Sequence, residues 1–264
     1  MEDIVLYEKE GDIGKITLNK PEKRNAIDLV TLKKLIDVFN KSAENNDICV
    51  IYSANGNDFT VGADLKYGYE LLTDDKRRDE AAEFLESFQN LTRSMISHPG
   101  IIIAGLHGWV IGGGFEQLLY CDLRIAANNT RIMLPELGVG LFFSNASTKL
   151  LPRIIGEGRA KDLMYLGGEI NAEEAFNIGL VNQVCKPEGL RRILKRIANT
   201  IVQKDHLALK LAKKLLNENQ DDPIESVLAK ELQAMILTGQ SAELKRRLKK
   251  FVKNKKNSHI FDIY

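Results

Sequence analysis

The sequence predicts an α/β fold, because short apolar segments rich in β-branched residues alternate with segments of helical periodicity. The clearest strand is IIIAG at 101–105, whose unbroken apolar run is typical of a strand buried on both faces. The clearest helix covers 81–95, where apolar side chains recur every three or four positions until Pro99-Gly100 ends the pattern. Such alternation favours a sheet whose strands are mostly parallel.

The other elements follow in chain order from similar patterns. Apolar side chains from Leu29 to Phe39 recur at helical spacing, and Asp28 is placed to cap that helix. From about residue 188 the pattern becomes helical, so we predict a core at 1–187 and a helical C-terminal region at 188–264. Further strands are expected at 13–18, 48–54 and 122–127, and C-terminal helices at 190–201, 206–217, 224–238 and 240–253.

Composition disfavours several classes of protein. The chain has 264 residues and a formal net charge of +1, so no overall field favours nucleic acid or a membrane as partner. No apolar run approaches the roughly 18 residues of a membrane span, and the acidic N-terminus resembles neither a signal nor a transit peptide. The scattered cysteines match no zinc site and no disulfide framework, and Cys49 and Cys121 are predicted to be core residues. We therefore expect a cytoplasmic protein that holds no metal.

The sequence GGGFE at 112–116 is the first candidate for chemistry. Its three glycines follow a predicted buried strand and precede a segment that could begin a helix. Glycine tolerates positive φ and lets another group approach the backbone closely. Amide N–H groups at such a junction bind negative charge, and they form an oxyanion hole when the charge develops during a reaction. A tight turn with a surface glutamate is the alternative interpretation.

Two other segments have a similar character. In FTVGADLK, Gly62 precedes Ala63 and Asp64 where a strand gives way to a helix, so this segment could supply a second amide N–H. In MLPELGVG, Glu136 follows a proline and an apolar stretch, where burial would raise its pKa. Two glutamates in different environments, here Glu116 and Glu136, are typical of acid–base catalysis at neutral pH.

Taken in order, these segments resemble the crotonase superfamily, the enoyl-CoA hydratase/isomerase family. The resemblance rests on five motifs in the family's order and spacing: ITLNKPEKRNAI, FTVGADLK, GWVIGGGFE, MLPELGVG and NAEEAFNIGLVNQV. It extends from about residue 12 to residue 185, and more weakly through the C-terminal helices. It implies a crotonase-like ββα spiral core with a helical C-terminal oligomerisation region, assembled as a homotrimer or a dimer of trimers.

The resemblance also implies an enzyme that stabilises the enolate of an acyl-CoA thioester. The N–H groups of Ala63 and Gly113 would bind the thioester oxygen and form the oxyanion hole. Glu116 would activate a water molecule, and Glu136 would deliver a proton to Cα. The presence of both glutamates favours hydration of a 2-enoyl-CoA to a 3-hydroxyacyl-CoA, because isomerases of the family can work with only the one matching Glu136.

The resemblance implies that CoA enters as part of the substrate and that no further cofactor is required. The sequence leaves open whether CoA or an acyl carrier protein carries the thioester. Lys23 and Arg24 would approach the CoA phosphates, although a plain surface loop is the alternative for their side chains. The residues expected beside the adenine and pantetheine are Ala63, Asp64, Leu65 and Lys66.

One segment departs from the family. After the second glutamate, hydratases usually carry a Pro-Gly-Ala-Gly-Gly-Thr-like stretch, where this chain has FFSNAST at 142–148. Phe142, Phe143 and Ser144 are predicted to line the acyl pocket. Because Phe143, Ser144 and Ser147 replace smaller residues, they could shrink the acyl site or supply a hydroxyl.

Alternatives from several classes stay open at this point. Within the family they are double-bond isomerisation, decarboxylation, thioester hydrolysis, ring-forming synthesis and acyl-CoA binding without catalysis. A dinucleotide-binding oxidoreductase is disfavoured because GWVIGGG has the wrong glycine spacing, and a serine hydrolase because no G-x-S-x-G segment occurs. The cationic segment KRRLKKFVKNKK at 245–256 is interpreted as a solvated helix face or as a contact for an anionic ligand.

Overall fold

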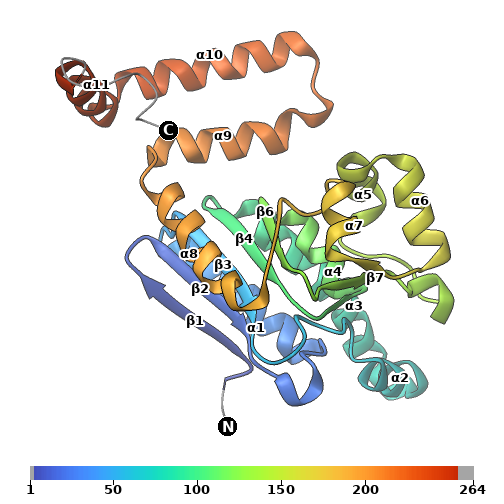
Figure 1. Cartoon of the computed structure of the whole chain (residues 1–264). Helices are drawn as coiled ribbons and strands as arrows, with labels where there is room; N and C mark the ends of the chain where they lie inside the picture. Colours follow the sequence, from blue (N-terminus) through green and yellow to red (C-terminus); the bar gives the residue numbers. More distant parts are fainter. Residues whose placement is uncertain (1–2, 255–264) are drawn as a thin grey trace. The chain divides into compact units, whose positions relative to one another are not determined.

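The computed structural model describes residues 3–254, which form two compact units divided after Ile201 (Figure 1). The first unit combines strands and helices, and the second is helical. The predicted α/β class is confirmed. The predicted boundary between a core at 1–187 and a helical region at 188–264 stays a prediction. Within residues 3–254, no helix combines the length and the apolar character that crossing a membrane requires.

The main sheet has six strands in the order β1-β2-β3-β4-β6-β9. β1 and β2 form an antiparallel hairpin, and the other neighbouring pairs are parallel. Parallel neighbours require a longer return of the chain, which helices supply between β2 and β3 and between β3 and β4. The strands are β1 (Val5–Glu10), β2 (Ile13–Leu18), β3 (Cys49–Ala54), β4 (Ile101–Leu106), β6 (Leu123–Ala127) and β9 (Gln183–Cys185).

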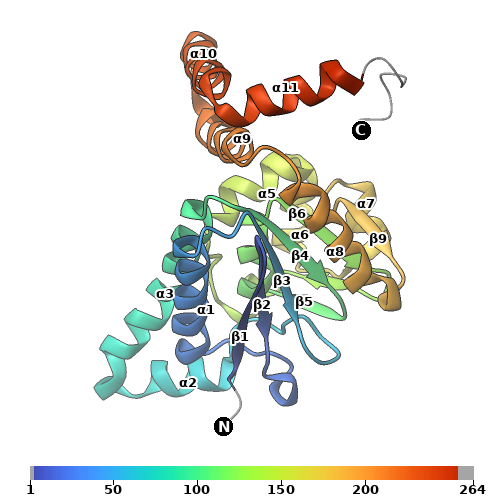
Figure 2. The same ribbon diagram turned by 90° about the vertical axis from the view of Figure 1, so that its left-hand side faces the viewer.

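Helices cover both faces of the main sheet (Figure 2). α1 (Leu29–Glu44) and α3 (Arg78–Ser97) lie on one face, and α8 (Pro187–Val202) lies on the other. β4 touches both layers: Leu106 belongs to the core that includes α1 and α3, whereas a side chain at Gly105 would collide with Leu194 of α8. The prediction that this strand is buried on both faces is confirmed.

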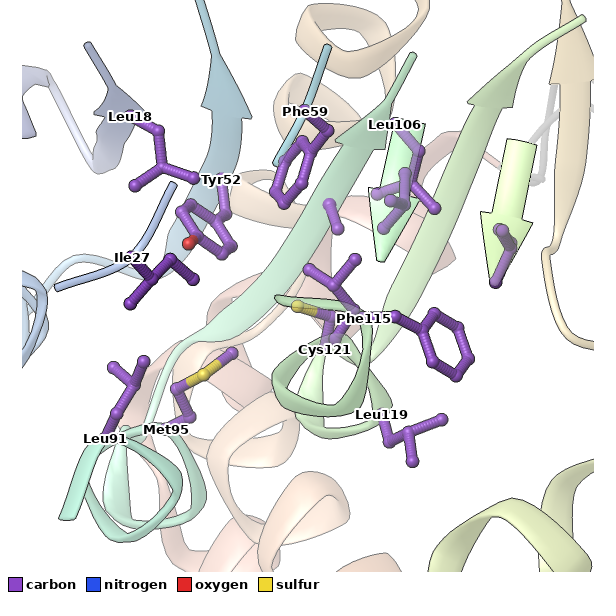
Figure 3. Packing of buried hydrophobic residues seen from close by; sticks show 14 of the residues in the cluster. Leu18, Ile27, Tyr52, Phe59, Leu91, Met95, Leu106, Phe115, Leu119 and Cys121 are labelled. Atoms are coloured by element: carbon purple, nitrogen blue, oxygen red, sulfur yellow. The ribbon is translucent and has the colours of Figure 1, made fainter. Parts of the chain in front are cut away.

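α1 and its neighbours show why the predicted helices form. Asp28 caps α1 by accepting a hydrogen bond from the Thr31 amide at 2.9 Å, as the sequence predicts. The apolar stripe of α1 is buried in a core that continues through Tyr52 and Phe59, whose rings meet edge to face at 5.2 Å (Figure 3). Phe115 lies fully buried in the same core and anchors the glycine-rich segment there. Cys49 and Cys121 are buried, as predicted.

A second, three-stranded sheet positions the glycine-rich segment. β5 (Trp109–Ile111) pairs in parallel with β7 (Arg131–Met133), which pairs in antiparallel with β8 (Ile170–Asn171). GGGFE follows β5, and Glu136 comes three residues after β7 ends. Because parallel strands end at the same edge, this pairing brings the two glutamate segments together. These strands escape sequence prediction because two or three residues show no periodicity.

The remaining helical elements of the first unit are short. α7 begins with a capping box, in which Asn171 accepts from the Glu174 amide and Glu174 accepts from the Asn171 amide. These two hydrogen bonds explain why α7 begins at Ala172, directly after Asn171. The short elements are α2 (Leu65–Thr73), α4 (Gly113–Glu116), α5 (Ser147–Ile155), α6 (Glu157–Leu166), α7 (Ala172–Asn177) and the 3-10 turns η1 (Pro21–Lys23), η2 (Asp75–Arg77), η3 (Gln117–Tyr120) and η4 (Glu136–Val139).

The second unit contains the helices predicted at 206–217, 224–238 and 240–253, whereas the helix predicted at 190–201 is α8. α9 and α10 enclose an apolar groove of about 660 Å³, and Leu232 and Met235 of α10 are exposed. The cationic segment lies on α11 as far as Asn254, and its last two residues fall outside the described part of the chain. Self-association stays a prediction. The elements are α9 (His206–Glu218), η5 (Asn219–Asp221), α10 (Ile224–Gln240) and α11 (Ala242–Asn254).

Asp47 joins β1 to the end of α1. Its fully buried carboxylate accepts hydrogen bonds from Tyr7 Oη at 2.7 Å and Ser42 Oγ at 2.6 Å, and it pairs with Lys9 Nζ at 2.8 Å. We predict that Asp47→Ala lowers the free energy of unfolding by about 3 kcal/mol, because it leaves buried donors without an acceptor. Urea denaturation measures this loss. Asp37→Ala, on the exposed face of α1, is the matched control, and an equal loss in both variants would contradict the prediction.

Candidate active site

The two predicted catalytic glutamates line one cavity of about 340 Å³ in the first unit. Its walls come from α2, α3, the start of α4, and the segment from η4 to Ser144. Most lining side chains are apolar, and the charged ones are Asp64, Glu116 and Glu136. A mostly apolar cavity with a few converging polar groups is typical of a small-molecule site.

Each of the three glycines has a close neighbour. Gly112 has φ 55°, and a Cβ there would lie 2.5 Å from Oε1 of Glu136. A Cβ at Gly113 would lie 3.0 Å from the ring of Phe88. A Cβ at Gly114 would collide with the methyl group of Thr60. Bare backbone is therefore needed because the second glutamate, α3 and the Thr60 segment all press against this turn.

The segment that carries Ala63 lies directly against the glycine turn. Thr60 pairs with the backbone of β5, donating to Trp109 O at 3.0 Å and accepting from the Ile111 amide at 3.1 Å. Gly62 has φ 80°, and a Cβ there would lie 2.6 Å from Ile111 O. The strand-to-helix turns at Ala63 and at Gly113 are thus held in contact, although 50 residues separate them.

The N-terminal motif NKPEKRNAI fixes this segment from its other side. Asn25, with φ 54°, donates from its side-chain amide to Asn55 O and Asp58 O, each at 2.9 Å. Its carbonyl accepts from Thr60 Oγ1 at 2.6 Å, and that hydroxyl accepts from the Gly62 amide at 3.0 Å. Asparagine is one of the few residues other than glycine that adopts this backbone conformation readily. Asn25 therefore has a structural role that the sequence interpretation did not assign to it.

The amide N–H groups of Ala63 and Gly113 remain available to a ligand. Within residues 3–254, no hydrogen bond uses either group, and both residues line the cavity. Buried amides normally find an acceptor, so two unpaired amides on one cavity wall are expected to bind an acceptor from a ligand.

Glu116 is almost fully buried, and its carboxylate accepts three hydrogen bonds. Its side chain is 1% exposed. Oε2 accepts from the Ser144 amide at 2.7 Å and from Ser147 Oγ in a short hydrogen bond, and Oε1 accepts from Ser144 Oγ at 3.2 Å. Burial raises the pKa of Glu116 to about 7, with a further rise from Glu136 and an opposing effect from these hydrogen bonds. The alternative of a surface glutamate is wrong.

Glu136 is buried with fewer partners. It is 7% exposed, and within the described residues its Oε2 has no hydrogen-bond partner. Burial raises the pKa of Glu136, as the sequence predicts, and a hydrogen bond from its own backbone amide partly opposes the rise. A carboxyl group that lacks donors favours its protonated form. The two glutamates thus have the differing environments that acid–base chemistry needs.

The FFSNAST segment contributes side chains to this site. Ser144 and Phe142 line the cavity, whereas Phe143 is partly buried against the hydrophobic core and tilts against Phe142 at 5.8 Å. The sequence suggested that this segment could supply a hydroxyl to the site. Two hydroxyls, those of Ser144 and Ser147, donate hydrogen bonds to Glu116. Sequence analysis did not single out Asn145, which is buried behind these serines.

The residues predicted to contact the pantetheine and adenine lie partly at the cavity. Asp64 and Leu65 line it, and Asp64 also caps α2 by accepting from the Tyr67 amide at 3.1 Å. Lys66 is exposed and is not among the lining residues. Their contact with CoA stays a prediction.

The predicted phosphate-binding residues lie in an exposed turn and are not among the residues that line the cavity. The side chain of Lys23 is exposed, and Arg24 Nε pairs with Asp58 at 2.7 Å. Arg24 has φ 52° and is followed by Asn25, also with positive φ. This geometry gives Arg24 a partner within the fold, and a role toward phosphates remains a prediction for both cations.

Most of the apolar lining of the cavity was not predicted from the sequence. Leu72 of α2 and Phe84, Leu85 and Phe88 of α3 face the cavity. The helical stripe that includes Phe84 and Phe88 indicates only that α3 has a buried side, because the pattern cannot distinguish core from cavity wall. Among the described residues, no cluster of His, Cys, Asp and Glu has the arrangement of a metal site.

Comparisons with known proteins point to one family. The model of the enoyl-CoA hydratase/isomerase family matches residues 8–259. The chain is 34% identical over 260 residues to the crotonyl-CoA hydratase of Syntrophomonas wolfei, with 97% of each chain covered. It is 32% identical over 254 residues to the short-chain-enoyl-CoA hydratase of Clostridium acetobutylicum, covering 96% of this chain and 95% of that protein. The structure of enoyl-CoA hydratase from Bacillus anthracis has a TM-score of 0.88 at 28% identity, covering 96% and 97% of the two chains.

Fold and comparisons together define the class of protein: a member of the crotonase superfamily. Within it, the chain belongs to the enoyl-CoA hydratase/isomerase family and is an enzyme of this type. The family and the crotonase-like fold predicted from five sequence motifs are confirmed.

Proposed function

We propose that this enzyme adds water to a short-chain 2-enoyl-CoA and forms a 3-hydroxyacyl-CoA. The observation that carries the proposal is the pairing of two buried glutamates with two unpaired amide N–H groups on one cavity. The names of the two relatives above, crotonyl-CoA hydratase and short-chain-enoyl-CoA hydratase, support the reaction. The cavity of about 340 Å³ supports a short acyl group, since ligand pockets span roughly 300–1,000 Å³.

In the proposed reaction the amides of Ala63 and Gly113 bind the thioester oxygen. Negative charge grows on that oxygen as water attacks Cβ, so these donors stabilise the transition state more than the ground state. The donors are backbone groups held by β5 and Thr60, and they need no rearrangement when the charge develops.

The two glutamates handle the protons. Glu116 accepts a proton from water as its oxygen bonds to Cβ, and Glu136 donates a proton to Cα of the enolate. The reaction therefore begins with Glu116 ionised and Glu136 protonated, and a proton returns from one to the other before the next turnover. The three donors on Glu116 and the unpaired Oε2 of Glu136 support this assignment.

Crotonyl-CoA and a 3-enoyl-CoA of equal length test the proposal. We expect crotonyl-CoA to lose its conjugated thioester absorbance and to yield 3-hydroxybutyryl-CoA, identified by chromatography. Efficient conversion of the 3-enoyl-CoA to a 2-enoyl-CoA without hydration of crotonyl-CoA would reject hydration in favour of isomerisation. Release of free CoA would instead indicate thioester hydrolysis.

A further inference from the structure

The segment from Ser144 to Ser147 forms a strained turn behind Glu116. Asn145 and Ala146 have φ 52° and 49°, and Ser147 begins α5. Asparagine tolerates this conformation, but alanine adopts it at a cost. Surrounding contacts must therefore hold the turn, and Tyr120 Oη supplies one by donating to Asn145 O at 2.7 Å.

A chain of side-chain hydrogen bonds runs through this turn and ends on Glu116. Thr92 Oγ1 of α3 donates to Asn145 Oδ1 at 2.8 Å, which fixes the orientation of the Asn145 amide. Asn145 Nδ2 then donates to Ser144 Oγ at 3.0 Å. Because this oxygen already accepts a hydrogen bond, its own hydrogen is directed to Glu116 Oε1 at 3.2 Å. Each group donates to the next, so the bonds polarise in one direction.

A second set of donors meets the other oxygen of Glu116. Oε2 accepts from Ser147 Oγ and from the Ser144 amide. Glu136, on the same cavity, receives one hydrogen bond from its own backbone amide, and its Oε2 receives none within the described residues. The fold thus directs its donors to one glutamate of the pair.

We propose that Asn145 and Ser147 are positioning residues that keep Glu116 ionised, so that the proton shared by the two glutamates resides on Glu136. Asn145 acts through Ser144, whose hydroxyl it holds as a donor, and Ser147 acts directly. This inference rests on the proposed function, because it decides which glutamate begins the reaction as base.

Hydrogen bonds stabilise the Glu116 carboxylate here because, among residues 3–254, no cationic side chain lines the cavity. The titratable groups that face Glu116 are Glu136 from η4 and Tyr120 from η3, and Asp64 at the start of α2 lies on the same cavity. A negative charge on Glu136 raises the pKa of Glu116, as burial does, whereas the hydrogen bonds from Ser147 and Ser144 lower it. With these hydrogen bonds in place the pKa of Glu116 is about 7, so ionisation of Glu116 at neutral pH requires both the hydrogen bonds and a protonated, uncharged Glu136.

Ser147→Ala is the direct test. Removing one donor to a carboxylate is expected to raise the pKa of Glu116 by about one to two pH units. The acid limb of the kcat/KM profile for crotonyl-CoA should move to higher pH by that amount, because the limb reports the ionisation of the base in the free enzyme. Infrared spectroscopy should show the carboxylic C=O band of Glu116, identified by its loss in Glu116→Gln, persisting to correspondingly higher pH.

Asn145→Gly tests the chain of hydrogen bonds by which Asn145 acts on Glu116 through Ser144. Glycine keeps the positive φ of this position, so loss of the side chain is separated from strain. We expect a shift in the same direction but smaller than that of Ser147→Ala. Thr148→Val is the matched control, since this neighbouring side chain is exposed and its hydroxyl lies outside the network.

The outcomes separate this inference from the proposed function. The infrared titration needs no turnover, so it remains decisive even if crotonyl-CoA is not a substrate. An unchanged Glu116 band and an unchanged acid limb in Ser147→Ala, with native thermal unfolding, would overturn the inference. A shift equal to that of Thr148→Val would do the same, because it would mark a general effect of removing a hydroxyl from this segment.

Discussion

Glu136→Gln is expected to lower kcat for crotonyl-CoA hydration by about 10²–10⁴-fold, the usual contribution of a general acid. Glutamine keeps the size of the side chain beside Gly112, but it cannot deliver a proton to Cα. KM should change little, because the proposed mechanism assigns the thioester oxygen to backbone amides rather than to this carboxyl. Steady-state kinetics measure both constants. Unchanged kcat with raised KM would show that Glu136 contributes to binding only.

Stability measurements test whether a loss of activity in Glu136→Gln is caused by unfolding of the variant. Because burial raises the pKa of Glu136 above its ordinary value of 4.5, the fold favours the protonated carboxyl, and native stability falls as pH rises through the raised pKa. Glutamine has no such ionisation, so the stability of Glu136→Gln relative to the wild type should increase with pH above 4.5. Glu157→Gln, which alters only an exposed glutamate, is the control for activity.

Gly114→Ala is expected to reduce kcat/KM by about 10²–10³-fold, as loss of an oxyanion-hole donor does. The new methyl group collides with the Cγ2 methyl of Thr60, and the backbone of the glycine turn or of the Ala63 segment must move apart. That movement misaligns the amides of Ala63 and Gly113. The strain should also lower the free energy of unfolding by about 1–3 kcal/mol.

Thr60→Ser offers a specific rescue of this variant. Serine lacks the colliding methyl group but keeps the hydroxyl that bonds to Asn25 O and the Gly62 amide. The next contacts of the new Cβ, at 3.2 Å, are tight but tolerable. Activity of Gly114→Ala combined with Thr60→Ser should therefore exceed that of Gly114→Ala alone. Failure of this rescue, or similar damage from Gly158→Ala, whose Cβ meets nothing within 4 Å, would contradict the explanation.

Long periodic elements could be predicted from the sequence, and short ones could not. The apolar run of β4 and the helical stripe of α3 each cover enough residues to reveal a period. β5, β7 and β8 have three residues or fewer, and their pairing depends on contacts distant in sequence. The parallel pairing of β5 with β7, which brings Glu136 to the glycine turn, could therefore be obtained only from the tertiary structure.

By itself, the sequence determined the α/β class and, through five ordered motifs, the family, and it singled out the two glutamates that line the cavity. The tertiary structure alone decided how those glutamates differ. Burial raises the pKa of both, but three hydrogen-bond donors converge on Glu116 while Oε2 of Glu136 has none among the described residues. The physical reason is that a carboxyl's ionisation depends on the groups around it in space, and here Thr92, Asn145 and Ser147 come from parts of the chain that are distant from Glu116.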